Sequence, residues 1–152
     1  MTEDIRWQQS FSNFRNALDK LVVAVEILKE DVSLDEDEDA EAQAAVDEIL
    51  KDGLIHRFEY TCRLAWTVMK DYATQDENTT IEGPGDAIRE AFKLRLISEV
   101  NEWMEMLESY KLSTQAYDDA AVNLLYKKIS KAYCDALVEF EGTMEGLVDR
   151  GN

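Results

Sequence analysis

Apolar residues recur along most of this chain at intervals of three and four, a spacing that places them on one face of an α-helix. The first such stripe predicts a helix over residues 4–30, and its positions are Trp7, Phe11, Phe14, Leu18, Leu21, Val25 and Leu28. A second stripe predicts a helix over residues 54–75, and its positions are Ile55, Phe58, Cys62, Ala65, Trp66, Met69, Tyr72 and Ala73. Such stripes usually form a packed core.

The segment between these helices starts with an unbroken acidic run, residues 35–39. Like charges at this density resist compaction, so we predict a solvated loop, with contact to a basic partner as the alternative. A short helix over about 40–51 follows, which makes 31–52 an acidic loop plus a short helix. We expect Gly53 to break or kink the chain before the second long helix.

Two shorter helices are predicted next. Gly83 and Pro84 indicate a helix start, with proline near the first helical position. The buried face of that helix is predicted to hold Ile88, Ala91 and Phe92. Ser98 is the expected N-cap of the following helix. The inward positions of that following helix are Val100, Trp103, Met104 and Leu107.

The segment 110–116 is predicted to be a short connection. A last long helix is expected over 117–144, and residues 148–152 are expected to fray. No segment alternates with the period of two that marks a strand. The pattern therefore predicts one all-α domain over residues 1–152, an up-and-down four-helix bundle with one or two additional short helices.

Composition narrows the partners. The net charge is −17, from 33 acidic and 16 basic side chains. Affinity for nucleic acid comes mainly from neutralising phosphates, so binding to nucleic acid by this chain alone is disfavoured, whereas a local basic pocket or a basic protein partner stays open. No long apolar run predicts a membrane span, and the polar N-terminus shows no signal peptide. We expect a cytoplasmic protein in which Cys62 and Cys134 are buried, reduced thiols.

Few residues offer catalytic or metal chemistry. With one histidine and two distant cysteines, neither a zinc site nor a ferritin-like di-iron site is expected. The GPGD turn at Gly83 is too short for a dinucleotide loop, so no cofactor is predicted. His56 is the single candidate for acid–base work by histidine. Arg89 follows the Gly-Pro turn, a context that suits the lip of a binding groove.

Four segments together resemble one family. DIRWQQSFSNFRNALDKL, GLIHRFEYTCRLAWTVMKDY, GPGDAIREAFKLRLI and WMEMLES…Y occur in the same order over about residues 4–140. They resemble the nucleotidyltransferase substrate-binding proteins, which are grouped with the HEPN superfamily. The resemblance implies a four-helix bundle, usually dimeric, that works with a separate minimal nucleotidyltransferase. Members are interpreted either as substrate- or nucleotide-binding subunits or as ribonuclease toxins that the transferase neutralises.

The ribonuclease motif of that superfamily is degenerate here. It places an arginine before a histidine, then any residue and a tyrosine; the histidine moves a proton and the arginine stabilises charge on the phosphate. In this chain Tyr110 stands at the arginine position and Gln115 at the histidine position, while Tyr117 is retained. Glutamine exchanges no proton near neutral pH, and Lys111 lacks the planar fork of arginine. The residues for metal-independent RNA cleavage are therefore missing.

The leading prediction is a non-catalytic interaction protein that homodimerises and pairs with a minimal nucleotidyltransferase, as in toxin–antitoxin pairs. The residues predicted to line a nucleotide- or substrate-binding groove are His56, Arg57, Arg63, Arg89, Gln115 and Tyr117. Among them Arg57 and Arg89 would meet phosphate or carboxylate, and Tyr117 would stack, donate a hydrogen bond or accept a covalent modification. The alternatives are a HEPN-type ribonuclease that relies on His56 and a helical scaffold of an unrelated complex.

Overall fold

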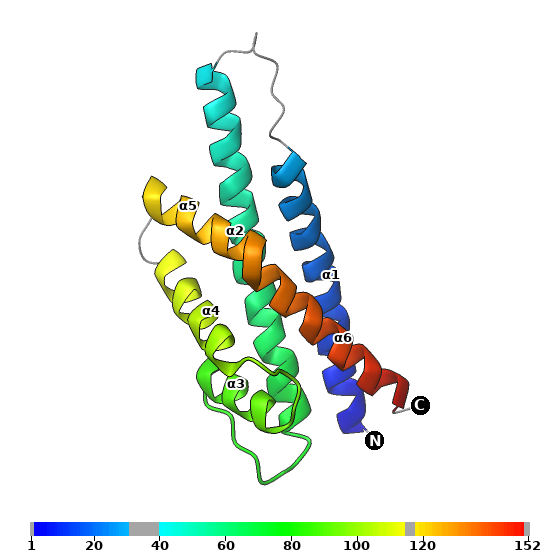
Figure 1. Cartoon of the computed structure of the whole chain (residues 1–152). Helices are drawn as coiled ribbons and strands as arrows, with labels where there is room; N and C mark the ends of the chain where they lie inside the picture. The colour runs from blue at the N-terminus through cyan, green and yellow to red at the C-terminus, as the bar shows by residue number, and fades with distance from the viewer. Residues whose placement is uncertain (1, 31–39, 115–117, 151–152) are drawn as a thin grey trace.

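A computed structural model of the protein describes residues 2–30, 40–114 and 118–150. The helices in chain order are α1 (Thr2–Glu30), α2 (Ala40–Ala73), α3 (Pro84–Lys93), α4 (Val100–Ser113), α5 (Asp119–Lys128), the π-helix η1 (Ile129–Tyr133) and α6 (Cys134–Arg150). No strand occurs among the described residues. Figure 1 shows α1, α2, α4 and the continuous run α5–η1–α6 alternating in direction, with the short α3 between α2 and α4. The predicted all-α, up-and-down bundle is confirmed.

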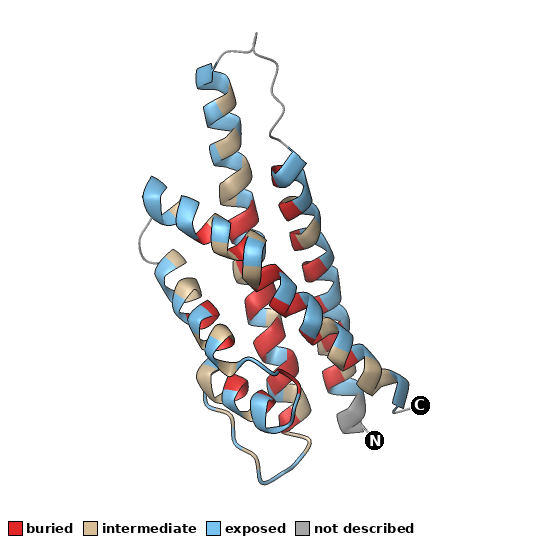
Figure 2. Cartoon of the chain, in the orientation of Figure 1, coloured by how far each residue is buried: buried red, intermediate tan, exposed pale blue. Residues whose placement is uncertain are grey.

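The core follows the predicted stripes. All seven apolar positions of the first stripe are buried on the inner side of α1, which packs most extensively against α2 (Figure 2). Phe140 of α6 meets the edges of two aromatic rings from other helices, Phe14 and Trp103, at centroid distances of 5.5 Å each. Cys62 and Cys134 are free and buried, as predicted, and burial raises the pKa of the Cys62 thiol well above its usual range.

Helix α2 corrects the prediction at Gly53. The chain stays helical through this glycine, so the expected short helix and long helix are one element of 34 residues. Glycine inside a helix costs about 1 kcal/mol relative to alanine. Leu54, Ile55 and Phe58 are fully buried directly after it, and burying each such side chain contributes about 1.5–3 kcal/mol. Tertiary packing therefore outweighs the local propensity.

Other boundaries also differ from prediction. Pro84 does begin α3 at its first turn, but Phe92 is 46% exposed because it lies on the outer side of that helix. Glu99, not Ser98, is the N-cap of α4, and the Ser98 hydroxyl instead donates to Glu139 Oε1 at 3.3 Å. Helix α4 continues to Ser113, so most of the expected connection 110–116 is helical.

The C-terminal run also departs from a single α-helix. Its first helical residue is Asp119 instead of the expected 117, and its N-cap is Asp118, whose Oδ1 accepts a hydrogen bond from the amide of Ala121 at 2.8 Å. It then passes through the π-turn η1, where the amide of Cys134 donates to the carbonyl of Ile129 five residues earlier. It stays helical to Arg150, so α6 includes residues 148–150, and fraying of the tail 148–152 stays a prediction. The acidic run 35–39 lies outside the described residues.

Two further properties of the fold are its membrane-spanning capacity and the burial of its tryptophans. Within the described ranges, no helix combines the length and the apolar character needed to cross a bilayer. Trp7, Trp66 and Trp103 are all buried within one chain, so no tryptophan stripe is left uncovered. The exposed large apolar side chains lie elsewhere, several of them on α2 before Gly53, on α4 and on α5.

Candidate functional site

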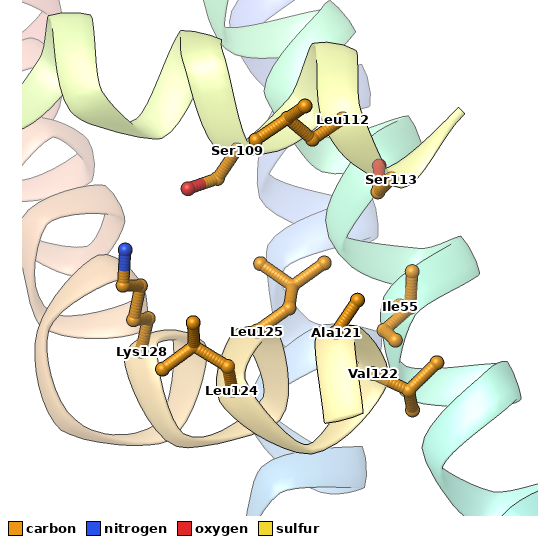
Figure 3. Close-up of a pocket in the computed structure, with 9 residues that line it drawn as sticks. All are labelled: Ile55, Ser109, Leu112, Ser113, Ala121, Val122, Leu124, Leu125 and Lys128. Carbon is orange, nitrogen blue, oxygen red and sulfur yellow. The ribbon is translucent and has the colours of Figure 1, made fainter. Parts of the chain in front are cut away.

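An apolar cavity of about 180 Å³ lies between α2, α4 and the start of α5 (Figure 3). It is lined by Ile55, Ser109, Leu112, Ser113, Ala121, Val122, Leu124, Leu125 and Lys128. Figure 3 shows Ser109 and Lys128 at one end of this cavity and Ile55, Val122 and Ser113 at the other. The cavity is thus lined by α4 and α5, the helices that precede and follow residues 115–117, with which the degenerate motif ends.

A partly buried hydrogen-bond chain borders the Ser109 end of this cavity. The Tyr133 hydroxyl donates to Glu105 Oε2 at 2.9 Å, and the Ser109 hydroxyl lies 2.9 Å from the same phenol oxygen. Because the carboxylate only accepts, the Tyr133 hydroxyl donates its hydrogen bond to Glu105 and the Ser109 hydroxyl donates to Tyr133. Burial, together with the carboxylate, raises the pKa of Tyr133 to about 12. This phenol therefore stays neutral at physiological pH and serves as a fixed structural donor.

The second serine of the wall, Ser113, also has hydrogen-bond partners within the chain. Its hydroxyl lies 2.7 Å from Glu59 Oε2 on α2 and 2.7 Å from the carbonyl of Tyr110. Tyr110, at the position of the motif arginine, packs its ring edge-on against Trp66 at a centroid distance of 4.9 Å. The position that would carry a phosphate-binding guanidinium is thus occupied by an aromatic ring packed between α4 and α2.

The structure places the four described members of the predicted groove in separate environments. His56 is exposed on α2. The Arg57 guanidinium donates to the carbonyl of Lys20 at 2.7 Å and so ties α2 to α1. Arg89 pairs with Asp86 at 2.6 Å on α3, and this hydrogen bond lowers the pKa of the Asp86 carboxyl. Arg63 lines a second cavity. Gln115 and Tyr117 lie outside the described residues.

The second cavity has a volume of about 310 Å³ and lies between α2 and the start of α3. Arg63 and Lys70 are its two cationic lining residues. The prediction from sequence had omitted Lys70. A signal was present, because residues seven apart are two helical turns apart and share a face. Arg57 and Arg63, six apart, differ by about 120° around the same helix, which is why they diverge.

Metal binding finds no support in the side-chain arrangement. Across residues 2–30, 40–114 and 118–150, no cluster of three or more His, Cys, Asp or Glu side chains is placed to hold a metal ion. The described chemistry of the two cavities is therefore apolar contact, hydroxyl hydrogen bonding and charge, from Lys128 in the first cavity and from Arg63, Lys70 and Glu82 in the second.

Fold and cavities together define a small helical-bundle protein with room for a ligand but without an evident proton-transfer centre in its described part. The family described as "Nucleotidyltransferase substrate binding protein like" matches residues 9–146. The chain belongs to this family, and the resemblance inferred from its sequence is confirmed.

Two relatives extend the comparison. The "Probable ribonuclease HepT" of Haemophilus influenzae (strain ATCC 51907 / DSM 11121 / KW20 / Rd) is 28% identical over 109 residues, which cover 69% of this chain and 72% of that protein. The crystal structure of ttk003001694 from Thermus thermophilus is similar with a TM-score of 0.52 at 23% identity, covering 86% of this chain and 97% of that one. At this identity the second likeness supports the fold alone.

Proposed function

We propose that this protein is a non-catalytic, substrate-binding subunit that works with a separate nucleotidyltransferase. The observation that carries the proposal is the family match, which spans residues 9–146 and so includes nearly all of the bundle. The chain itself contains no phosphate-cradling loop for nucleotidyl transfer, so the transfer chemistry would belong to the partner.

The absence of catalysis is supported by what stands at the motif positions. Tyr110 replaces the arginine and is packed against Trp66, and Gln115 replaces the histidine. The single histidine of the chain, His56, is on α2, and not on the segment that carries the superfamily histidine. The Tyr133 phenol beside the apolar cavity has a pKa of about 12, so it keeps its proton near neutral pH.

A second candidate function is RNA cleavage, because one relative is named a probable ribonuclease. In this chain that activity would have to use His56. The test is an RNA cleavage assay of the native protein and His56→Ala. We expect no cleavage from either. Cleavage that persists through purification and is lost in the variant would establish the ribonuclease and overturn our proposal.

The nucleotidyltransferase would contact the surface around the apolar cavity. Leu112 is 62% and Leu124 is 56% exposed there, on two adjacent helices. Exposed leucines that flank an apolar cavity are the kind of surface that a partner covers. Co-expression with a minimal nucleotidyltransferase encoded by an adjacent gene should give a stable complex. Leu124→Glu should abolish co-purification, whereas Ile27→Glu, a comparable exposed position on α1, should leave it intact.

Homodimerisation remains a prediction, as does pairing in a toxin–antitoxin module. Light scattering of the native chain measures its mass directly, and a monomer at all concentrations would remove the dimer. A charge of −17 on each copy opposes association, so any dimer should tighten as salt screens this repulsion. If Leu124→Glu converts the dimer to a monomer and also abolishes co-purification of the transferase, the second copy of the chain and the transferase bind the same surface. A cytoplasmic location is likewise predicted, and fractionation tests it.

Nucleotide binding by this subunit is the remaining part of the proposal. Arg63 is the predicted groove residue that lines a cavity, and so it is the one from which we expect ligand contact. Calorimetric titration with nucleotides, with and without the transferase, tests this. Absence of binding in both states would remove the ligand role while leaving the association with the transferase to be judged by co-purification.

A further inference from the structure

The cavity between α2 and α3 concentrates positive charge on a strongly acidic protein. Arg63 and Lys70 line it from one face of α2, two turns apart, or about 10 Å along the helix axis. Neither forms an ion pair with a described residue, although the chain has about twice as many acidic as basic side chains. Two such cations on one cavity wall favour an anion between them.

The opposite wall adds further positive potential. It is formed by the start of α3, where Gly83 is the N-cap and Pro84 the first helical residue. No side chain caps this helix and Pro84 has no N–H, so the first amides are those of Gly85 and Asp86, which lack the carboxylate or hydroxyl oxygen that commonly accepts such hydrogen bonds. A helix start carries about half a positive charge, which also favours an anion.

A third observation comes from Trp66, which also lines this cavity. Its side chain is only 6% exposed, and its indole N–H has no acceptor among the described residues. Nearly all buried donors in native proteins have an acceptor. Trp66 therefore adds a buried indole N–H without an acceptor in the described chain to a residue that lines the cavity.

One carboxylate that lines this cavity would repel a bound anion. Glu82 lines the cavity, and its amide donates to Asp86 Oδ2 at 3.1 Å. Asp86 does not line the cavity, and Arg89 already compensates its charge. Two cations and a helix start against one carboxylate leave the balance positive. The cavity also has apolar walls, among them Ile81 and Ala87, which suit the uncharged part of a small molecule.

We propose that this cavity binds the phosphate group of a small phosphorylated ligand between Arg63, Lys70 and the start of α3. The volume of about 310 Å³ is at the lower end for small-molecule sites, so the ligand is a monophosphate of modest size and not a polymer. The proposal rests on the ligand-binding part of the proposed function. It does not require association with a transferase.

The test is a titration of the full chain with inorganic phosphate, AMP and adenosine at low ionic strength, followed by ¹⁵N NMR. The chain has three tryptophans, so Trp66→Phe assigns the Trp66 indole peak. Phosphate and AMP should shift this peak and the amide of Gly85 saturably, and adenosine should not. If AMP binds more tightly than phosphate, the apolar walls contribute and the proposal stands.

Charge variants locate the site. Arg63→Gln and Lys70→Gln change exposed side chains and should each weaken binding about tenfold, while Glu82→Gln should tighten it severalfold. Lys93→Gln removes the same charge from the far end of α3 and should leave the affinity unchanged. The proposal is overturned if neither phosphate nor AMP shifts these peaks, if adenosine binds as well as AMP, or if Lys93→Gln weakens binding equally. A complex that still forms with the transferase would then show that only the ligand site had failed.

Discussion

The two parts of α2 on either side of Gly53 belong to one helix but have different surroundings. After the glycine, ten residues are buried in the bundle core; before it, none of the residues 40–52 is buried. Figure 1 shows this first part projecting past α5 and α6. Packing therefore holds the longer part of this helix, whereas the first part continues beyond the core with no fully buried side chain.

The largest effect is expected in the buried part. Phe58 is fully buried and stacked on Tyr133 at a centroid distance of 5.7 Å. Phe58→Ala removes this contact and leaves a cavity, which should lower the free energy of unfolding by about 3–5 kcal/mol. Urea denaturation measures this. Tyr60→Ala, at a half-exposed aromatic on the same helix, is the control and should cost less than about 1 kcal/mol. Equal losses would show that Phe58 is no more buried in solution than Tyr60, which contradicts the packing of this part of α2.

A smaller effect is expected at the partner of Phe58. Tyr133→Phe removes the hydrogen bonds with Ser109 and Glu105, and at neutral pH it should cost about 1–2 kcal/mol in urea denaturation. The phenol has an unfolded pKa near 10 and a folded pKa of about 12. Folding favours the neutral form of this phenol. Its contribution to the free energy of unfolding is therefore complete below pH 10 and is lost as the pH rises towards 12.

The native protein should therefore lose about 2 kcal/mol more than Tyr133→Phe between pH 10 and 12, because the variant has no phenol to ionise at this position. Other tyrosines and the lysines titrate equally in both proteins and cancel in the difference. Parallel pH profiles for the two proteins would show that burial does not raise the pKa of Tyr133.

At the junction itself, Gly53→Ala should stabilise the protein by about 0.5–1 kcal/mol. A Cβ built at this position meets nothing within 4 Å, and alanine has the higher helix propensity. Hydrogen exchange should show the gain as slower exchange of the amides in the first part of α2. Loss of stability would instead mean that the continuous helix through residue 53 is not the native conformation.

The smallest effect is expected at the projecting part. Ile49 is 68% exposed, so Ile49→Ala should change the free energy of unfolding by less than about 0.5 kcal/mol. If the same variant weakens co-purification with the transferase, this part of α2 belongs to the partner surface. A loss of several kcal/mol in the isolated chain would show that the residue is covered in solution.

The sequence was most informative where packing and periodicity agree. The α1 stripe from Trp7 to Leu28 is buried position by position, because a long helix with one apolar face has a single way to bury it. The prediction at Gly53 was wrong because its propensity cost is local, whereas the burial of Leu54 and Phe58 depends on helices far away in the sequence. The π-turn at residues 129–133 leaves no trace in a pattern of threes and fours.

The candidate sites were less predictable because they depend on how helices meet. The family could be identified from whole segments, and the chain does belong to it. Arg57 and Arg63 were grouped by charge, but the hydrogen bond from Arg57 to Lys20 depends on the α1–α2 packing. Lys70 becomes adjacent to the start of α3 only after the loop 74–83 has folded back. The spacing of seven residues could have predicted that Arg63 and Lys70 share a face of α2. It could not have predicted which residues form the opposite wall of the cavity.

The π-turn η1 has a consequence for how this family could vary. A π-turn contains one more residue than the α-helical turn it replaces, but both complete one rotation of about 360°. Deleting a single exposed residue there, such as Lys131, would restore regular α-helical winding while α5 and α6 keep their relative phase. Leu124 and Leu125 would then stay on the walls of the apolar cavity. The π-turn is thus a place where the chain can gain or lose one codon without reorienting the helices on either side of it.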